Sequence, residues 1–174
     1  MIKEIQEDEF APFFELMAEV ECGKHFDFNN RNHIKWLKKR ISIHFFQGTK
    51  FFGYFTEDNS PMGFAALLID EGPEGVSCFG QKCELLDIGV IPQHRGKGIG
   101  SELLKYVEEY AEKLGVYCMY MSTYARDYDV IAFYGKNGFV PVATLPDVHG
   151  PNDEGIVFMR KLFERLKEDA LHGC

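Results

Sequence analysis

Three glycines alternate in the segment Arg95 to Gly100, which follows an apolar stretch and precedes a helical pattern. Glycines allow successive backbone N–H groups to point into one concavity, because no Cβ atom obstructs them. A helix that begins here adds its unpaired N-terminal N–H groups and the positive end of its dipole. The combination predicts an anion site suited to a phosphate or a pyrophosphate.

The spacing of this turn excludes two common phosphate motifs. A Walker A loop has four residues between its glycines, but six residues separate Gly89 from Gly96, and Gly98 instead of Ser or Thr follows Lys97. A dinucleotide fingerprint begins with G-x-G, but Ser101 stands where its third glycine belongs. Two alternatives remain at this point: the turn binds no ligand, or the protein binds a nucleotide.

The pattern that does fit is R-x-x-G-x-G after V-x-P, with Arg95, Gly98 and Gly100 at its fixed positions. Here the sequence resembles the GCN5-related N-acetyltransferase (GNAT) superfamily, whose signature Q/R-x-x-G-x-G/A opens a helix after a bulged strand. The segment 132–139 resembles a second family pattern, A-x-x-F-Y-x-K-x-G-F, slightly compressed at its start. The resemblance covers most of the chain and is strongest from residue 84 to residue 140.

This resemblance implies that acetyl-CoA is the acyl donor. The backbone amides of the glycine turn would hold the pyrophosphate, and the strand before it would bind the pantetheine arm as an added strand. A backbone N–H near Val90 would polarise the thioester carbonyl. The implied donor-binding residues are Gly89, Val90, Ile91, Arg95, Gly96, Lys97, Gly98, Ile99, Gly100 and Ser101.

Acyl transfer to an amine has two proton requirements. An alkyl ammonium, with a pKa near ~10.4, must lose a proton, and a leaving thiolate benefits from gaining one, so a general base and a general acid are expected. The resemblance implies Tyr134 as the acid. It also implies Glu84 as the base, because Glu84 matches a strand glutamate of the histone-acetylating branch; a water chain is the alternative. Strand alternation places Glu84 and Val90 on one face and Asp87 on the other.

The acceptor is expected to be a small-molecule amine or a peptide amine. In the family the first two helices and the last strands hold the acceptor, so the connections 22–33 and 145–154 are the expected specificity segments. The formal net charge of −8 favours a cationic small molecule. The asparagine that the family often has after its fifth strand is absent, with Thr123 and Tyr124 in that neighbourhood.

Composition narrows the remaining classes. With 19 basic and 27 acidic residues, the chain is not expected to bind nucleic acid. The five cysteines and six histidines lack metal-ligand or disulfide spacing, so neither kind of site is predicted. No run of about 18 uncharged apolar residues occurs, and the first residues lack an apolar signal core; we expect a cytoplasmic protein without a membrane span.

The elements that position these residues follow from hydrophobic spacing. Helices are predicted over 8–22, 30–46, 100–114 and 127–137, and strands over 51–56, 62–69, 85–91, 116–123, 139–144 and 155–161. This order agrees with the fold that the resemblance implies: an α/β (α+β) protein with a mixed, mostly antiparallel sheet, splayed between strands four and five and flanked by helices. One domain, 1–174, is expected, with a core over about 2–162 and a polar tail over 163–174.

The leading hypothesis is an N-acetyltransferase that works by direct attack in a ternary complex. Cys83 or Cys118 as a covalent nucleophile is the competing chemistry, although no motif supplies either with a histidine partner. A non-catalytic acyl-CoA sensor is the alternative from another functional class. A homodimer is possible, because the family often dimerises.

Overall fold

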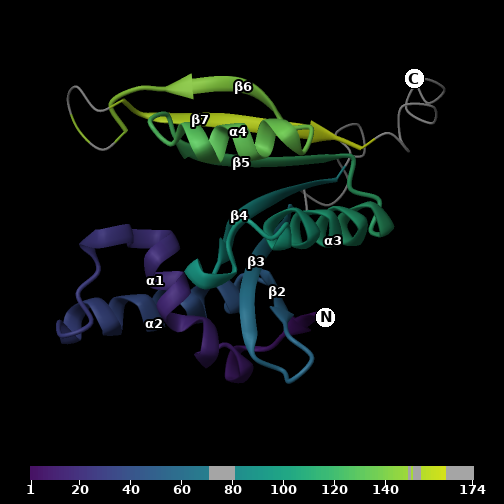
Figure 1. The fold of residues 1–174 in the computed structure, drawn as a ribbon. Coiled ribbons are helices and arrows are strands. Elements are labelled where there is room, and N and C mark those ends of the chain that lie inside the picture. The colour runs from purple at the N-terminus through teal and green to yellow at the C-terminus, as the bar shows by residue number, and fades with distance from the viewer. Residues whose placement is uncertain (71–80, 149, 151–153, 164–174) are drawn as a thin grey trace. The chain divides into compact units, whose positions relative to one another are not determined.

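The fold is that of a computed structural model, which describes residues 1–70, 81–148, 150 and 154–163 (Figure 1). The described residues form seven strands in the order β1-β2-β3-β4-β5-β7-β6. The chain groups into two compact units: unit 1 is Met1–Leu68 with Leu85–Glu109, and unit 2 is Ile69–Glu84 with Tyr110–Cys174. Two strands and one helix belong partly to each unit, and we describe each unit by itself.

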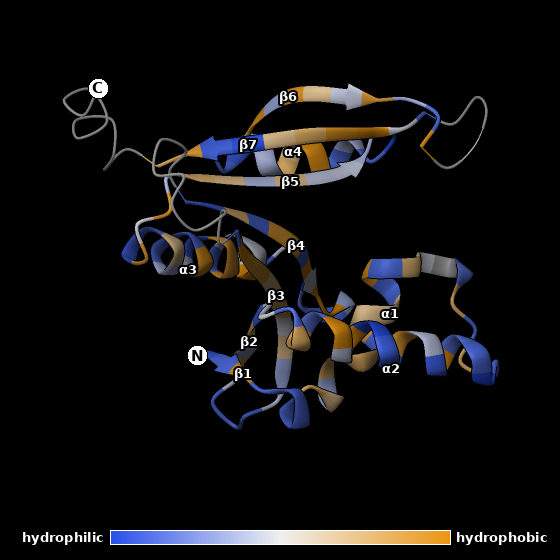
Figure 2. Ribbon diagram, turned by 180° about the vertical axis from the view of Figure 1, so that it is seen from behind, coloured by the Kyte–Doolittle hydropathy of each residue, from blue (hydrophilic) through white to orange (hydrophobic). Residues whose placement is uncertain are grey.

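Unit 1 combines antiparallel strands with three helices. Its elements are β1 (Ile2–Ile5), β2 (Lys50–Phe55), β3 (Pro61–Asp70), the second half of β4 (Lys82–Val90), α1 (Phe14–Cys22), α2 (Arg31–Phe46) and most of α3 (Ile99–Lys113). The side chain of Asn30 caps α2 by accepting a hydrogen bond from the backbone N–H of Asn32. Hydrophobic and hydrophilic residues alternate along α3 (Figure 2), as expected of a helix with one buried face.

The core of unit 1 is built largely from phenylalanine. Phe10 lies at the centre, with its ring 4.9 Å from that of Phe51 and 5.7 Å from that of Phe64, both in edge-on geometry. Phe13 adds a further ring from the turn before α1, and all four rings are buried. Such edge-to-face contacts add to the free energy of burial. The cluster fixes α1 and α2 against the strands.

Unit 2 contains β5 (Cys118–Tyr124), α4 (Tyr128–Lys136), β6 (Val140–Leu145) and β7 (Ile156–Leu162). Strands β5 and β7 pair antiparallel along the whole of both, and β6 pairs with the outer edge of β7. The parallel ladder between β4 and β5 covers only Lys82 to Glu84. The mixed sheet, its helices and this early end of the β4–β5 ladder confirm the predicted fold class.

Most predicted elements are present, with two corrections at the ends. The chain begins with β1, which sequence analysis missed, and the helix predicted over 8–22 becomes an α-helix only at Phe14, after two short 3₁₀ turns. Phe163 is buried and donates its backbone N–H to Tyr117, so the core extends one residue into the predicted tail. The rest of that tail and much of the 145–154 connection lie outside the described residues.

No helix within the described ranges is both long enough and apolar enough to span a bilayer. The basic residues of α2 lie on its exposed face, as its amphipathic pattern predicts.

Candidate functional site

The glycine turn joins β4 to α3 through a short 3₁₀ turn, Pro92–His94. Gly96 and Gly98 have φ angles of +73° and +85°, in the left-handed region that disfavours other residues. A Cβ atom at either position would meet nothing within 4 Å. These two glycines are therefore required by backbone conformation, and the space beside them is open. An open backbone cradle fits a pyrophosphate group.

Helix α3 supplies the other half of this cradle. Its first intrahelical hydrogen bond is the one that Glu102 donates to the carbonyl of Gly98, at 3.0 Å. The amides of Ile99, Gly100 and Ser101 precede this bond at the positive end of the helix dipole. Ile99 is 4% exposed, so its side chain anchors the helix start in the core.

Both basic side chains of the turn fold back against it. The Arg95 guanidinium donates from Nε to the Val90 carbonyl at 2.8 Å and from Nη2 to the Glu19 carboxylate at 2.6 Å. Lys97 donates from Nζ to the carbonyl of Gln93 at 3.1 Å. Both side chains are exposed. They place two positive charges beside the open cradle, which favours an anionic ligand there.

The backbone N–H groups at the end of β4 point in defined directions. Ile91 donates its N–H to the carbonyl of Met62 in β3, at 2.9 Å. Successive residues of an extended strand point their N–H groups to opposite edges, so the N–H of Val90 points away from β3. The Val90 carbonyl lies on the same edge and accepts from Arg95. This is the orientation that the predicted role of Val90 requires, whereas the Ile91 N–H is engaged within the sheet.

Two glycines allow other elements to approach β4. A Cβ atom on Gly63 in β3 would lie 2.6 Å from the backbone oxygen of Gly89 and 3.3 Å from Val90 Cα. A Cβ atom on Gly89 would lie 2.8 Å from Val20 and 3.1 Å from Leu16, both in α1. Gly89 is thus needed for the close approach of α1. Sequence analysis missed Gly63, although a glycine inside a strand signals such an approach.

Glu84 and Tyr134 belong to unit 2, whereas the glycine turn and Val90 belong to unit 1. Glu84 is half-buried and lies opposite Tyr120 of β5 in the parallel ladder. Burial raises the pKa of Tyr120, and the charge and hydrogen bonding of Glu84 raise it further, to about 12. The Glu84 carboxylate therefore has a phenol partner that the sequence did not reveal.

Tyr134 is 3% exposed on α4. Its ring packs edge-on against Phe133 at 5.1 Å and Phe139 at 5.3 Å. The Tyr134 ring therefore packs in the core of unit 2. This packing role is separate from the predicted role of its hydroxyl group as a proton donor.

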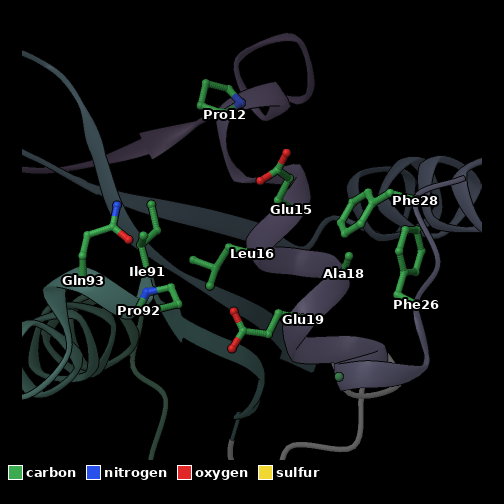
Figure 3. Close-up of a pocket in the computed structure, with 11 residues that line it drawn as sticks. Pro12, Glu15, Leu16, Ala18, Glu19, Phe26, Phe28, Ile91, Pro92 and Gln93 are labelled. Atoms are coloured by element: carbon green, nitrogen blue, oxygen red, sulfur yellow. The ribbon is translucent and has the colours of Figure 1, made fainter.

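A pocket of about 520 Å³ lies within unit 1 (Figure 3). It is lined by Pro12, Glu15, Leu16, Ala18, Glu19, Gly23, Phe26, Phe28, Ile91, Pro92 and Gln93. Leu16 and Glu19 point from α1 toward Ile91 and Pro92, at the end of β4. The pocket therefore adjoins both the strand end and the glycine turn. Three lining residues come from the predicted specificity segment 22–33, but the acidic residues of α1 were not anticipated.

Three titratable side chains of unit 1 form a separate cluster. Glu21, His44 and Asp87 offer potential metal-ligand atoms within 4.8 Å of one another. Burial raises the pKa of Glu21, but contacts with His44 and Arg40 outweigh it and leave this pKa below its ordinary value. Arg40 donates to Glu21 at 2.8 Å, whereas His44 Nε2 lies 3.6 Å from the same oxygen, which is longer than a hydrogen bond. Because Arg40 already neutralises this carboxylate, we assign the cluster to an ion-pair network.

Neither candidate cysteine is suited to nucleophilic attack. Cys83 and Cys118 are both buried, at 0% and 6% exposure. Burial raises the pKa of the Cys118 thiol, so this residue is protonated near neutral pH.

Comparison with known proteins gives partial sequence matches and full-length structural matches. "Uncharacterized N-acetyltransferase YobR" of Bacillus subtilis is 32% identical over 59 residues, which are 34% of this chain and 24% of that protein. Among solved structures, the ribosomal-protein-alanine N-acetyltransferase of Brucella melitensis has a TM-score of 0.66 at 22% identity, covering 94% of this chain and 99% of its own. The PaiA N-acetyltransferase of Thermoplasma acidophilum, solved with coenzyme A, has a TM-score of 0.67 at 20% identity, covering 94% and 98%.

The structural matches establish the fold, and a family model adds a match in sequence. The chain spans only about a quarter of the length of the curated relative described above. The model of the Acetyltransferase (GNAT) family, by contrast, matches residues 3–139. That match includes β4, the open glycine turn and α3, and most of the chain around them. The chain therefore belongs to the GNAT family of acetyltransferases.

Proposed function

We propose that this protein transfers an acetyl group from acetyl-CoA to a primary amine by direct attack in a ternary complex. N-acetylation that depends on acetyl-CoA is general for the family. The observation that carries the proposal is the open, left-handed glycine turn that joins α3 to a strand whose Val90 N–H points away from β3. A pyrophosphate cradle is thus continuous with a backbone donor.

In this proposal, each part of the arrangement binds a different portion of acetyl-CoA. The amides from Gly96 to Ser101 bind the pyrophosphate, and the charges of Arg95 and Lys97 support them. The backbone of Gly89, Val90 and Ile91 provides the edge along which the pantetheine arm lies. Because the Ile91 N–H is bonded to β3, we assign the edge donor to Val90.

The reaction needs one proton removed and one supplied. Glu84, directly or through water, takes a proton from the acceptor ammonium, and the amine lone pair then attacks the thioester carbonyl carbon. A carbon–nitrogen bond forms, and the Val90 N–H stabilises the negative oxygen of the tetrahedral intermediate. The carbon–sulfur bond then breaks, and Tyr134 donates a proton to the leaving thiolate. The Tyr134 phenolate, directly or through water, takes up the extra proton of the amide nitrogen, so the products are an acetamide and coenzyme A.

A non-catalytic acyl-CoA sensor of the same fold is the second candidate. Tyr134 favours the enzyme, because a sensor has no use for a proton donor. Both candidates require the same donor site, so the decisive test must measure binding and transfer separately.

The glycine turn offers a matched pair of variants for this test. Gly98 has a φ of +85° and Gly115, at the end of α3, has a φ of +81°, and a Cβ atom on either would meet nothing within 4 Å. Alanine costs about 1–2 kcal/mol of backbone strain at either position. We expect Gly98→Ala to raise the Kd for coenzyme A about tenfold, and Gly115→Ala to leave it unchanged. Calorimetry measures Kd, and mass spectrometry detects acetylated amines.

The outcomes separate the candidates. Acetylated product from any primary amine, together with a selective effect of Gly98→Ala, supports the enzyme. Coenzyme A binding without transfer to a broad amine panel supports the sensor. Equal effects of the two alanine variants on Kd would remove the glycine turn from the donor site.

A further inference from the structure

The side chains that line the pocket beside α1 carry only negative charge. Of its eleven lining residues, only Glu15 and Glu19 are charged, and both are exposed. They are one helical turn apart, which places their Cβ atoms about 5–6 Å from each other on the same face. Two carboxylates at this spacing repel an anionic ligand and attract a cationic one. The pocket is therefore not expected to bind the phosphate groups of acetyl-CoA.

Glu19 is also tied to the glycine turn. Its carboxylate accepts a hydrogen bond from Arg95 at 2.6 Å, and the side chains of this pair are 44% and 51% exposed. Exposed ion pairs contribute little free energy, so a pyrophosphate beside the turn competes effectively for the Arg95 guanidinium. Donor binding thus releases the Glu19 carboxylate toward the pocket.

The remaining walls are apolar. The rings of Phe26 and Phe28 lie 4.8 Å apart at 61°, and Phe28 is 47% exposed. Leu16, Ile91 and Pro92 add aliphatic surface on the other side of the pocket. Such walls suit a methylene chain, and a ring face also attracts an ammonium group. The volume of about 520 Å³ is in the range of small-molecule sites.

We propose that this pocket binds the acceptor as an aliphatic diamine or polyamine. Glu15 and Glu19 hold the ammonium that does not react, the apolar walls hold the methylene chain, and the second amine extends toward the end of β4. The proposal rests on the proposed N-acetyltransferase function and specifies its substrate class. It also predicts ordered binding, with the donor first, because the Arg95 guanidinium is hydrogen-bonded to the Glu19 carboxylate until the pyrophosphate binds.

Three five-carbon amines test the charge requirement: 1,5-diaminopentane, pentylamine and 5-aminopentanoate end in a second ammonium, a methyl and a carboxylate. We expect kcat/KM for acetyl transfer to fall in that order. Glu15→Gln should lower the preference for the diamine over pentylamine about fivefold and leave the KM for acetyl-CoA unchanged. Glu109→Gln, an exposed change on α3 outside the pocket, serves as the control.

Calorimetry with 1,5-diaminopentane supplies a readout that does not depend on turnover. We expect binding to the coenzyme A-loaded protein, weakened by Glu15→Gln, and weaker binding to the free protein. Transfer with a diamine preference that Glu15→Gln leaves unchanged overturns the pocket assignment and leaves the proposed function standing. Diamine binding without any acetyl transfer supports the pocket and rejects the proposed enzyme.

Discussion

At the scale of single residues, Tyr134 has a packing role that can be separated from its proposed chemical role. Its ring is held between Phe133 and Phe139, and it is almost completely buried. Phenylalanine at this position keeps the ring and removes only the hydroxyl. The substitution therefore tests proton donation without opening a cavity.

We predict that Tyr134→Phe lowers kcat about a hundredfold and leaves the KM for acetyl-CoA nearly unchanged, because general acid catalysis acts on the leaving thiolate and not on donor binding. The melting temperature should remain close to that of the wild type. Thiol release under saturating substrates measures kcat, and circular dichroism measures the melt. Tyr128→Phe is the control, since Tyr128 is on the same helix and 76% exposed. A Tyr134→Phe variant with full kcat would assign the proton to water.

Single residues also show which parts of the candidate site could be predicted from the sequence. The glycine turn could be predicted because its residues are contiguous, and its left-handed backbone imposes glycine at fixed spacing. The contacts of Gly63, Glu19 and Tyr120 could not, because each residue acts from another element; for Gly63 the sequence signals a close approach but not the partner. Gly63 matters only because β3 lies against Gly89, and Glu19 only because α1 brings it to Arg95.

At the scale of elements, α1, α2 and β4 are joined by the cluster of Glu21, His44 and Asp87. The Glu21 side chain is 12% exposed and accepts from Arg40, and both nitrogens of the buried His44 lack a hydrogen-bond partner among the described residues. A negative charge on Glu21 is the natural counterpart of the Arg40 guanidinium. The cluster thus ties α1, which lines the pocket, and α2 to the strand that ends at Val90.

We predict that this cluster makes the protein sensitive to acid. Burial opposes the charged form of Glu21, but His44 and Arg40 outweigh it, so its pKa in the folded state lies below its ordinary value of 4.5. The native state then binds fewer protons than the unfolded chain. The stabilisation is present above the ordinary pKa and is lost as the pH falls through the folded-state pKa.

Glu21→Gln should therefore lower the free energy of unfolding by about 2 kcal/mol near neutral pH, because Arg40 loses its counter-charge. The difference from the wild type should shrink as the pH falls through the folded-state pKa of Glu21, because its carboxylate then becomes protonated. Urea titrations at neutral pH and at successively lower pH values measure this difference, with Glu109→Gln as an exposed control. A difference that is constant with pH would mean that Glu21 acts through packing alone.

Elements with strong periodicity were predictable, and those that depend on a partner were not. The helix predicted over 30–46 matches α2 closely, since its apolar positions recur on one face and Asn30 caps it. Strand β1 has four residues and gains its stability only by pairing with β2, so its own sequence carries little signal. The predicted helix began too early because Phe10 and Phe13 fit a helical stripe, whereas Phe10 lies between two 3₁₀ turns and Phe13 ends the second, and both rings are buried in the core.

At the scale of the whole molecule, the two compact units are linked by shared elements. The chain passes between them within β3, after Leu68, within β4, after Glu84, and within α3, after Glu109. Breaking either unit alone would require an interruption of a strand or a helix, with loss of its backbone hydrogen bonds. We therefore propose that residues 1–174 behave as one domain in unfolding, although their contacts separate into two groups.

This proposal predicts one unfolding transition seen by probes in both units. Trp36 is the single tryptophan and lies on α2 in unit 1, and the amides of β5 and β7 report on unit 2 by hydrogen exchange. Coenzyme A at about 100 times its Kd should add ~2.7 kcal/mol and raise the melting temperature by about 5–10 °C. Because the proposed donor cradle lies in unit 1, equal stabilisation of both probes requires coupling through the shared elements β3, β4 and α3. A ligand shift seen by Trp36 but not by β5 and β7 would divide the chain into two separately folding parts.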